Sequence, residues 1–119
     1  MNKLFVSLSL PALLIAAPAI AGDQDFTLYN KTGYDIAEVY VSPARANAWG
    51  KDVLKDNVLE DTHYIPITFK ATNSTCTYDL KVVFTDGDDA HWSNFDLCTI
   101  SKISIFWNAK TQKATAKWE

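Results

Sequence analysis

The sequence contains few of the residues from which enzymes and metal proteins build their sites. Its 119 residues include two histidines, His63 and His91, two cysteines and one methionine. The cysteines, Cys76 and Cys98, fit no Cys-x-x-Cys spacing, and a zinc site would need more ligands than the two histidines add. Zinc binding and thiol redox chemistry are therefore disfavoured, and no cofactor is expected.

The sequence also lacks an excess of positive charge. Eleven Lys and Arg residues stand against fourteen Asp and Glu, which gives a formal net charge of −3. Proteins that bind nucleic acid or anionic lipid surfaces through their overall charge are normally basic. Nucleic acid is therefore not expected as a partner. No block of like charge indicates a disordered tail.

A long apolar run occurs only at the N-terminus. One positive charge, Lys3, precedes an apolar stretch over residues 4–15, and the small residues of 19–21 then offer a small-x-small cleavage site. This is the three-part pattern of a secretory signal peptide. Prolines interrupt the run, which is shorter than the roughly 20 apolar residues of a membrane span. We expect residues 1–21 to be a cleaved signal peptide on a periplasmic or secreted protein, and residues 22–119 to form one domain.

The rest of the chain is dominated by alternating apolar and polar residues, the pattern of half-buried strands. The predicted strands are 25–29, 35–42, 64–69, 76–85, 89–98, 101–107 and 112–118. A bulge is expected near Ala37, and Pro66 favours an edge position for its strand. Residues 43–59 are the least strand-like and predict a packed loop or a short helix near 50–55. The sequence thus predicts an all-β fold, a small antiparallel β-sandwich of six or seven strands.

The two cysteines are expected to form a disulfide, because two cysteines in an exported chain favour one. A three-residue hairpin loop at 86–88 would place Thr85 opposite Asp89. The same register places Cys76 directly opposite Cys98, at a separation that a disulfide can bridge after a modest local twist. The register arithmetic therefore supports both the hairpin and the bridge.

Several short motifs are distributed over nearly the whole chain that follows the predicted signal peptide. They are Thr32-Gly33-Tyr34, Val39–Pro43, Trp49-Gly50, Tyr78–Val83, Asp86-Gly87 and Asp96–Cys98. With them the sequence resembles a family of short secreted bacterial proteins of no established function. Some similar chains carry the name argininosuccinate lyase, but those lyases are long helical enzymes, so that activity is not carried over. The sequence departs from the family at Glu60-Asp61, where a Pro/Gly turn is usual. The resemblance implies export and a bacterial source, and it implies no ligand.

Four tryptophans are a high number for a chain of this length. Trp49 and Trp92 are expected in the core. Trp107 and Trp118 lie near strand ends, where exposed aromatic rings can contact a sugar or a protein partner. The alternative is that a small core simply uses large side chains. Trp107 and Trp118 are therefore the candidate ligand contacts.

Acidic residues gather at one predicted turn. Asp86, Asp88 and Asp89 are accounted for by turn chemistry and solubility. The alternative is a calcium site, since calcium prefers oxygen ligands, although the EF-hand pattern is absent. His91 shares a strand face with Asp89 and Ser93, which forms a row of side chains and not a catalytic triad. No catalytic residue is expected.

Three classes of function remain open. The favoured one is an exported, non-catalytic binding module for an unknown protein or glycan. The second is a structural or inhibitory partner protein, and the third is an enzyme of unrecognised type. An exposed row of aromatic residues would favour the first, and a long exposed loop at 43–59 or 70–75 the second. A pocket that gathers His63 or His91 with aspartates would favour the third.

Overall fold

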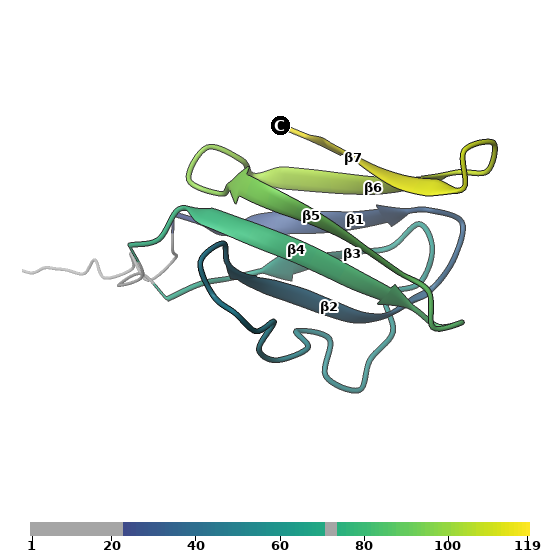
Figure 1. Cartoon of the computed structure of the whole chain (residues 1–119), viewed down its shortest axis with the longest axis horizontal. Helices are drawn as coiled ribbons and strands as arrows, with labels where there is room; N and C mark the ends of the chain where they lie inside the picture. Colours follow the sequence, from purple (N-terminus) through teal and green to yellow (C-terminus); the bar gives the residue numbers. More distant parts are fainter. Residues whose placement is uncertain (1–22, 71–73) are drawn as a thin grey trace, which may run out of the picture.

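The protein folds as two β-sheets packed face to face (Figure 1). The computed structural model describes residues 23–70 and 74–119, so the predicted signal peptide lies outside the described residues. Every named element of the described part is a strand, and no helix there is long and apolar enough to cross a membrane. The strands are β1 (Phe26–Lys31), β2 (Ile36–Pro43), β3 (Tyr64–Ile67), β4 (Thr77–Phe84), β5 (Asp89–Asp96), β6 (Lys102–Asn108) and β7 (Lys113–Trp118).

The seven strands divide into a four-stranded sheet, β3-β1-β6-β7, and a three-stranded sheet, β2-β4-β5. Four of the five strand pairs are antiparallel, and β1 pairs with β6 in parallel. The parallel pair is possible because the chain passes through the other sheet between these two strands, which gives it the long connection that parallel strands need. The predicted all-β sandwich is confirmed, with one parallel pair in a mostly antiparallel fold.

Alternation along the strands places one face of each sheet in the core. Leu28, Ile103 and Ile105 of the four-stranded sheet are fully buried, as are Val39 and Val82 of the three-stranded sheet. Burying a side chain of this kind contributes about 1.5–3 kcal/mol. The core therefore fixes which residues of each strand face solvent and remain available for a site.

The stretch between β2 and β3 is a packed loop, and the helix predicted near 50–55 is wrong. Leu54 is 3% exposed, within a series of turns. Asp52 Oδ1 accepts hydrogen bonds from the backbone N–H groups of Val39 and Leu54, both at 2.9 Å. The carboxylate thus ties the loop to the edge of β2. Lys55, with φ at 58°, then turns the chain out of the helical region.

The hairpin between β4 and β5 has the predicted loop length but begins one residue earlier than expected. Phe84 donates its N–H to the carbonyl of Asp88 at 2.7 Å, which leaves residues 85–87 as the loop. Gly87 takes φ of 96°, a conformation that glycine adopts without steric cost. The predicted loop at 86–88 is wrong because the positive φ at Gly87 closes the turn before Asp88.

A bulge in β5 then brings the cysteines together. Asn94 has φ of 64°, and its N–H is bonded to Asp79 Oδ1 at 2.9 Å, where the register of β4 and β5 shifts. Beyond the strand pair, Leu97 donates its N–H to the Cys76 carbonyl at 2.9 Å. Cys76 therefore lies opposite Leu97 and bonds to the next residue, Cys98, with a Cα–Cα distance of 5.2 Å. The disulfide is confirmed, while the uninterrupted register that predicted it is wrong.

Three further predictions concern the bulge in β2, the position of β3 and the burial of Trp49. The register of β2 shifts between Ile36 and Glu38, which confirms the bulge near Ala37. β3, which contains Pro66, lies at a sheet edge as predicted. Trp49 is not a core residue: it is only half-buried, because its loop runs outside the sandwich.

Candidate functional site

The β1–β2, β4–β5 and β6–β7 turns lie at one end of the sandwich, on the right in Figure 1. Residues of these turns and of the adjoining strand ends line a groove. Its volume is about 680 Å³. The side chains that line it are Tyr34, Phe84, Asp86, Asp88, Asp89, Ala90, His91, Trp107, Ala109, Gln112, Lys113 and Ala114. We call this feature the turn-end groove. Candidate residues from distant parts of the sequence, the acidic turn and Trp107, meet in it.

Two aromatic side chains in the turn-end groove stand at right angles. The ring centroids of Tyr34 and Trp107 are 6.4 Å apart, with an interplanar angle of 89°. Tyr34 is 54% exposed and Trp107 is half-buried. Phe84, which is largely buried, also lines the groove. The groove thus offers apolar and aromatic surface that solvent reaches.

The acidic turn gives the groove a negative side. Asp86 Oδ1 accepts the N–H of Asp88 at 2.9 Å, so Asp86 shapes the turn. Asp88 and Asp89 are both exposed. Besides these three carboxylates, the lining includes one ammonium group, that of Lys113. The groove therefore favours a positively charged ligand over an anion.

The carboxylates of the acidic turn do not converge on a point. Among the described residues, the group of three His, Cys, Asp or Glu side chains with ligand atoms within 4.8 Å of one another is Cys76, Asp96 and Cys98. The two sulfur atoms of that group are bonded to each other, so they offer no thiolate to a metal. Calcium binding at Asp86, Asp88 and Asp89 has no geometric support.

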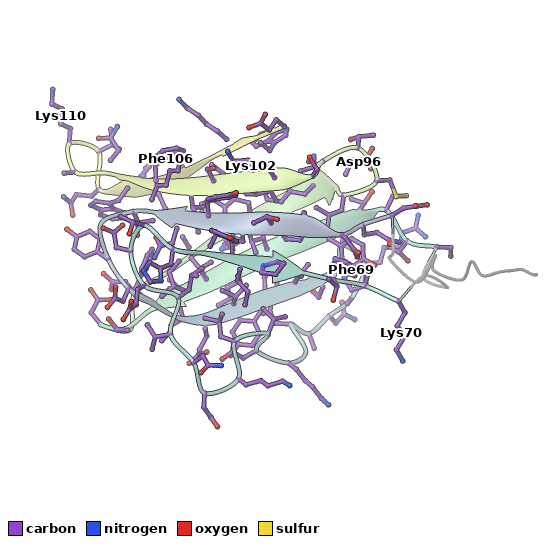
Figure 2. All side chains as sticks on the ribbon, turned by 180° about the vertical axis from the view of Figure 1, so that it is seen from behind. Phe69, Lys70, Asp96, Lys102, Phe106 and Lys110 are labelled. Atoms are coloured by element: carbon purple, nitrogen blue, oxygen red, sulfur yellow. A yellow bond between two sulfur atoms is a disulfide. The ribbon has the colours of Figure 1, made fainter. Side chains whose placement is uncertain are left out.

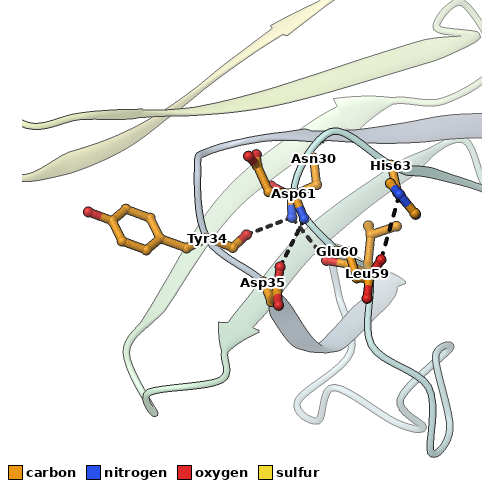
Figure 3. A network of polar contacts seen from close by, with 7 residues as sticks. All are labelled: Asn30, Tyr34, Asp35, Leu59, Glu60, Asp61 and His63. Carbon is orange, nitrogen blue, oxygen red and sulfur yellow. Dashed lines mark hydrogen bonds and ion pairs between the residues drawn. The ribbon is translucent and has the colours of Figure 1, made fainter.

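Tyr34 is held in the groove by a buried asparagine (Figure 3). Asn30 is fully buried, and its Nδ2 donates to the carbonyls of Tyr34 at 2.8 Å and Leu59 at 3.0 Å. Its Oδ1 accepts from the N–H and the hydroxyl of Thr32, at 3.1 and 2.7 Å. Thr32 Oγ1 in turn accepts the Tyr34 N–H at 3.1 Å. The backbone of Tyr34 is fixed on both sides before any ligand binds.

A second layer of polar contacts supports this turn (Figure 3). Asp61 Oδ1 accepts the N–H of Gly33 at 2.8 Å, and Asp35 Oδ1 accepts the N–H of Asp61 at 3.0 Å. His63 lies 3.6 Å from Glu60 in an exposed ion pair and does not line the groove. The segment that departs from the resembled family, Glu60-Asp61, therefore supports the turn that carries Tyr34.

The sequence pattern did not identify Asn30 as a structural residue, because the predicted strand ended at residue 29. In the structure Asn30 belongs to β1, on the same inward face as Phe26 and Leu28. The alternation of β1, if continued past residue 29, would have placed Asn30 on the inward face. A polar residue at an inward position requires hydrogen-bond partners, since an unsatisfied buried amide is costly. Tyr34 carried no comparable signal, since nothing local places it beside Trp107.

The second candidate tryptophan lies at the opposite end of the sandwich. Trp118 is 57% exposed and packs edge-on against Phe95, with ring centroids 5.3 Å apart. It pairs with Ile103 at the start of β6, whereas Trp107 is near the end of that strand. Trp107 and Trp118 therefore do not form one site, and only Trp107 lines the turn-end groove.

His91 lies beside aspartates in the groove, but its described contact is with another ring. Its centroid is 6.5 Å from that of Trp49. Within residues 23–70 and 74–119, no hydrogen bond or ion pair joins His91 to Asp86, Asp88 or Asp89. The groove lining contains no serine, threonine or cysteine. The groove lining therefore lacks the hydroxyl or thiol partner of a Ser–His, Thr–His or Cys–His pair.

One titratable group outside the groove has a shifted pKa. The Tyr40 hydroxyl donates a hydrogen bond to Glu38 Oε1. That bond, with desolvation and the charges of Glu38 and Asp52, raises the pKa of Tyr40 above 10.0. The contribution of this shift to stability is complete below the pKa of unfolded tyrosine and is lost as the pH rises through the folded value.

Replacing Glu38 with glutamine should lower the pKa of Tyr40, because the amide can accept the hydrogen bond but carries no charge. The measurement is phenolate absorbance against pH, with Tyr40 assigned from the difference between the wild type and Tyr40→Phe. Asp23→Asn, a change at an exposed residue outside this contact, serves as the control. A pKa for Tyr40 that is unchanged in Glu38→Gln would contradict the cause assigned here.

Comparison with known proteins finds a similar structure and no similar sequence. Neither a family model nor a curated protein sequence matches the chain. Its fold is similar to that of a protein from Eubacterium rectale solved by NMR, with a TM-score of 0.57 and 13% identity, over 87% of this chain and 93% of that one. At this identity the likeness shows the fold alone. The resemblance to short secreted bacterial proteins stays a prediction.

Proposed function

We propose that the protein is an exported, non-catalytic binding module whose turn-end groove takes a cationic ligand. The observation that carries the proposal is the convergence of two perpendicular rings, Tyr34 and Trp107, with three carboxylates in one solvent-open groove. Aromatic faces attract cations through their quadrupole, and the carboxylates add charge complementarity. A primary amine, a guanidinium or a quaternary ammonium group attached to an apolar body has the required chemistry.

Preorganisation supports a binding role. The Asn30 network fixes the backbone that carries Tyr34, and Gly87 and Asp86 fix the acidic turn. A ligand then loses less free energy to ordering the site. The disulfide is compatible with the periplasmic or extracellular location that the signal-peptide pattern predicts.

The alternatives have less support. The groove gathers His91 with aspartates, the arrangement that would favour an enzyme, yet its lining has no hydroxyl or thiol nucleophile other than the Tyr34 phenol. A long exposed loop would favour the second class, a structural or inhibitory partner protein. The 43–59 loop is anchored on the sandwich by the buried Leu54 and Leu59, although most of its other residues are exposed, so it meets this criterion in part. Part of the 70–75 stretch lies outside the described residues.

The proposal predicts that small cations perturb Trp107 and leave Trp118 unchanged. Arginine amide and tetramethylammonium are suitable probes, titrated into nitrogen-15-labelled protein while the four indole N–H signals are followed. We expect the Trp107 signal to shift with a dissociation constant of about 1 mM, as befits so small a ligand. No shift of Trp107, or an equal shift of Trp118, would contradict the proposal.

A charge variant with a matched control tests the acidic turn. Asp88→Asn with Asp89→Asn removes two carboxylates and leaves Asp86, which holds the turn. If each exposed charge contact contributes 0.2–1 kcal/mol to binding, the loss of both should weaken binding by about tenfold. Asp23→Asn with Asp56→Asn makes the same change in net charge at exposed residues that do not line the groove. Equal loss in both variants would show that the effect depends on net charge and not on this site.

A further inference from the structure

The outer face of the four-stranded sheet carries a second, chemically distinct surface. Alternation directs one set of side chains from these strands away from the core. We call these residues the lysine–aromatic face: Tyr64 of β3, Tyr29 and Lys31 of β1, Lys102 and Phe106 of β6, and Lys117 of β7. Figure 2 views the molecule from behind, with Lys102 and Phe106 labelled.

Contacts between the side chains show that these residues share one surface. The rings of Tyr29 and Tyr64 have centroids 5.1 Å apart. Lys102 Nζ lies 4.6 Å from the Tyr29 ring centroid, and Lys117 Nζ lies 5.5 Å from that of Phe106. Lys31 Nζ lies between these two rings, at 5.9 Å from Tyr29 and 6.0 Å from Phe106. Lysines from three neighbouring strands, β1, β6 and β7, thus place their ammonium groups beside the rings of Tyr29 and Phe106.

The charge of this face is opposite in sign to that of the whole chain. The net charge is −3, yet none of the outward positions of the four strands is Asp or Glu. The one ion pair described for these lysines joins Lys102 to Glu119 at 3.6 Å, with the Glu119 side chain 75% exposed. An exposed pair of this kind is weak and can exchange for another anion.

Hydroxyl groups lie between the lysines. The strand register aligns Tyr64, Tyr29, Ser104 and Lys117 in one row across the sheet. The neighbouring rows contain Thr27 beside Lys102 and Lys31 beside Phe106 and Thr115. Such rows recur about every 7 Å along the strands, since two residues rise by 6.4–6.8 Å. Cations and aromatic rings, with the hydroxyls of Thr27 and Thr115, therefore lie in neighbouring rows on this face.

We propose that the lysine–aromatic face binds an acidic polysaccharide. Such a polymer offers carboxylates for the lysines, hydroxyls for Thr27 and Thr115, and apolar ring faces for the tyrosines, which match the three chemistries of this face. The disulfide is compatible with a location outside the cytoplasm, where acidic polysaccharides are more abundant than nucleic acid. This surface lies apart from the turn-end groove, and the proposal is independent of the groove's ligand.

The test is isothermal titration of the whole chain with polygalacturonate, with neutral dextran as the reference polymer. We expect binding of polygalacturonate that weakens with salt, and none of dextran. Replacing Lys31, Lys102 and Lys117 together with glutamine should weaken binding by about tenfold or more, given 0.2–1 kcal/mol for each exposed charge contact. The matched control is Lys51→Gln with Lys55→Gln and Lys110→Gln, three exposed lysines away from this face.

Further outcomes separate this surface from general attraction between charges. Tyr64→Ala preserves every charge and should also weaken binding, because Tyr64 is 61% exposed and offers its ring to the polymer. Asp88→Asn with Asp89→Asn should leave polysaccharide binding intact, which distinguishes failure here from failure of the groove proposal. Lack of binding to polygalacturonate, equal loss in the control lysine variant, or equal binding of single-stranded DNA would overturn the proposal.

Discussion

Replacing both Cys76 and Cys98 with alanine should lower the free energy of unfolding by about 3 kcal/mol, the chain-entropy value for closing a loop of this length. The bridge spans 22 positions of sequence. Cys98 is exposed and Cys76 only half-buried, so little packing is lost with the side chains. Small domains have about 5–15 kcal/mol of stability in total, so the variant should still fold. The measurement is the denaturant midpoint, with β-sheet content followed by circular dichroism.

Reduction of the wild type provides the matched control for the disulfide. If the bond itself is responsible, reduced wild type and the double variant should unfold at the same denaturant concentration. A single replacement should behave worse in cells, because the remaining thiol can form bonds with other chains. Two titratable thiols in unfolded, unreduced protein would show that the bridge is not formed.

Asn30→Ala should be as damaging as loss of the disulfide, at about 3 kcal/mol, since each buried polar group left unsatisfied costs about 1–3 kcal/mol. The change removes both donors to the Tyr34 and Leu59 carbonyls and the acceptor for Thr32. It also releases the turn that carries Tyr34. We therefore expect a lower denaturant midpoint and, in conditions where the variant folds, weaker binding of cations in the groove.

Asn108→Ala is the control for that result. Asn108 Oδ1 also accepts two backbone hydrogen bonds, from Lys110 at 2.9 Å and Thr111 at 3.2 Å, but Asn108 is exposed. Water can replace its bonds, so we expect a loss below about 1 kcal/mol. A loss in Asn30→Ala no greater than in Asn108→Ala would contradict the structural role assigned to the buried asparagine.

The strands were predictable because a strand needs only its own alternation. The patterns over 25–29 and 101–107 each lie within two residues of the strands β1 and β6. The disulfide was predictable from chemistry, because two cysteines in an exported chain tend to pair. The helix near 50–55 was a wrong prediction. The apolar spacing there reflects the packing of Val53 and Leu54 against the core from a series of turns, and not a helical face.

The pairing of β4 with β5 shows why counting residues from a predicted loop is insufficient to assign the register of a hairpin. The turn closes at Gly87 and the bulge at Asn94 shifts the pairing again, and the geometry of each depends on a positive φ that sequence spacing does not count. The earlier loop and the bulge each shift the pairing, and with the turn that follows β5 they still bring the cysteines together. The disulfide was thus predicted correctly from an incorrect register.

By itself the sequence determined the all-β class, the strand positions and the disulfide, because these follow from alternation along each strand and from cysteine chemistry. The tertiary structure alone decided the candidate sites. Tyr34 and Trp107 lie 73 positions apart and meet only because β1 and β6 pair in parallel within one sheet. The same pairing gathers Lys31 and Lys102 on one face of an acidic chain. Net charge sums over all residues, whereas binding depends on which charges share a surface.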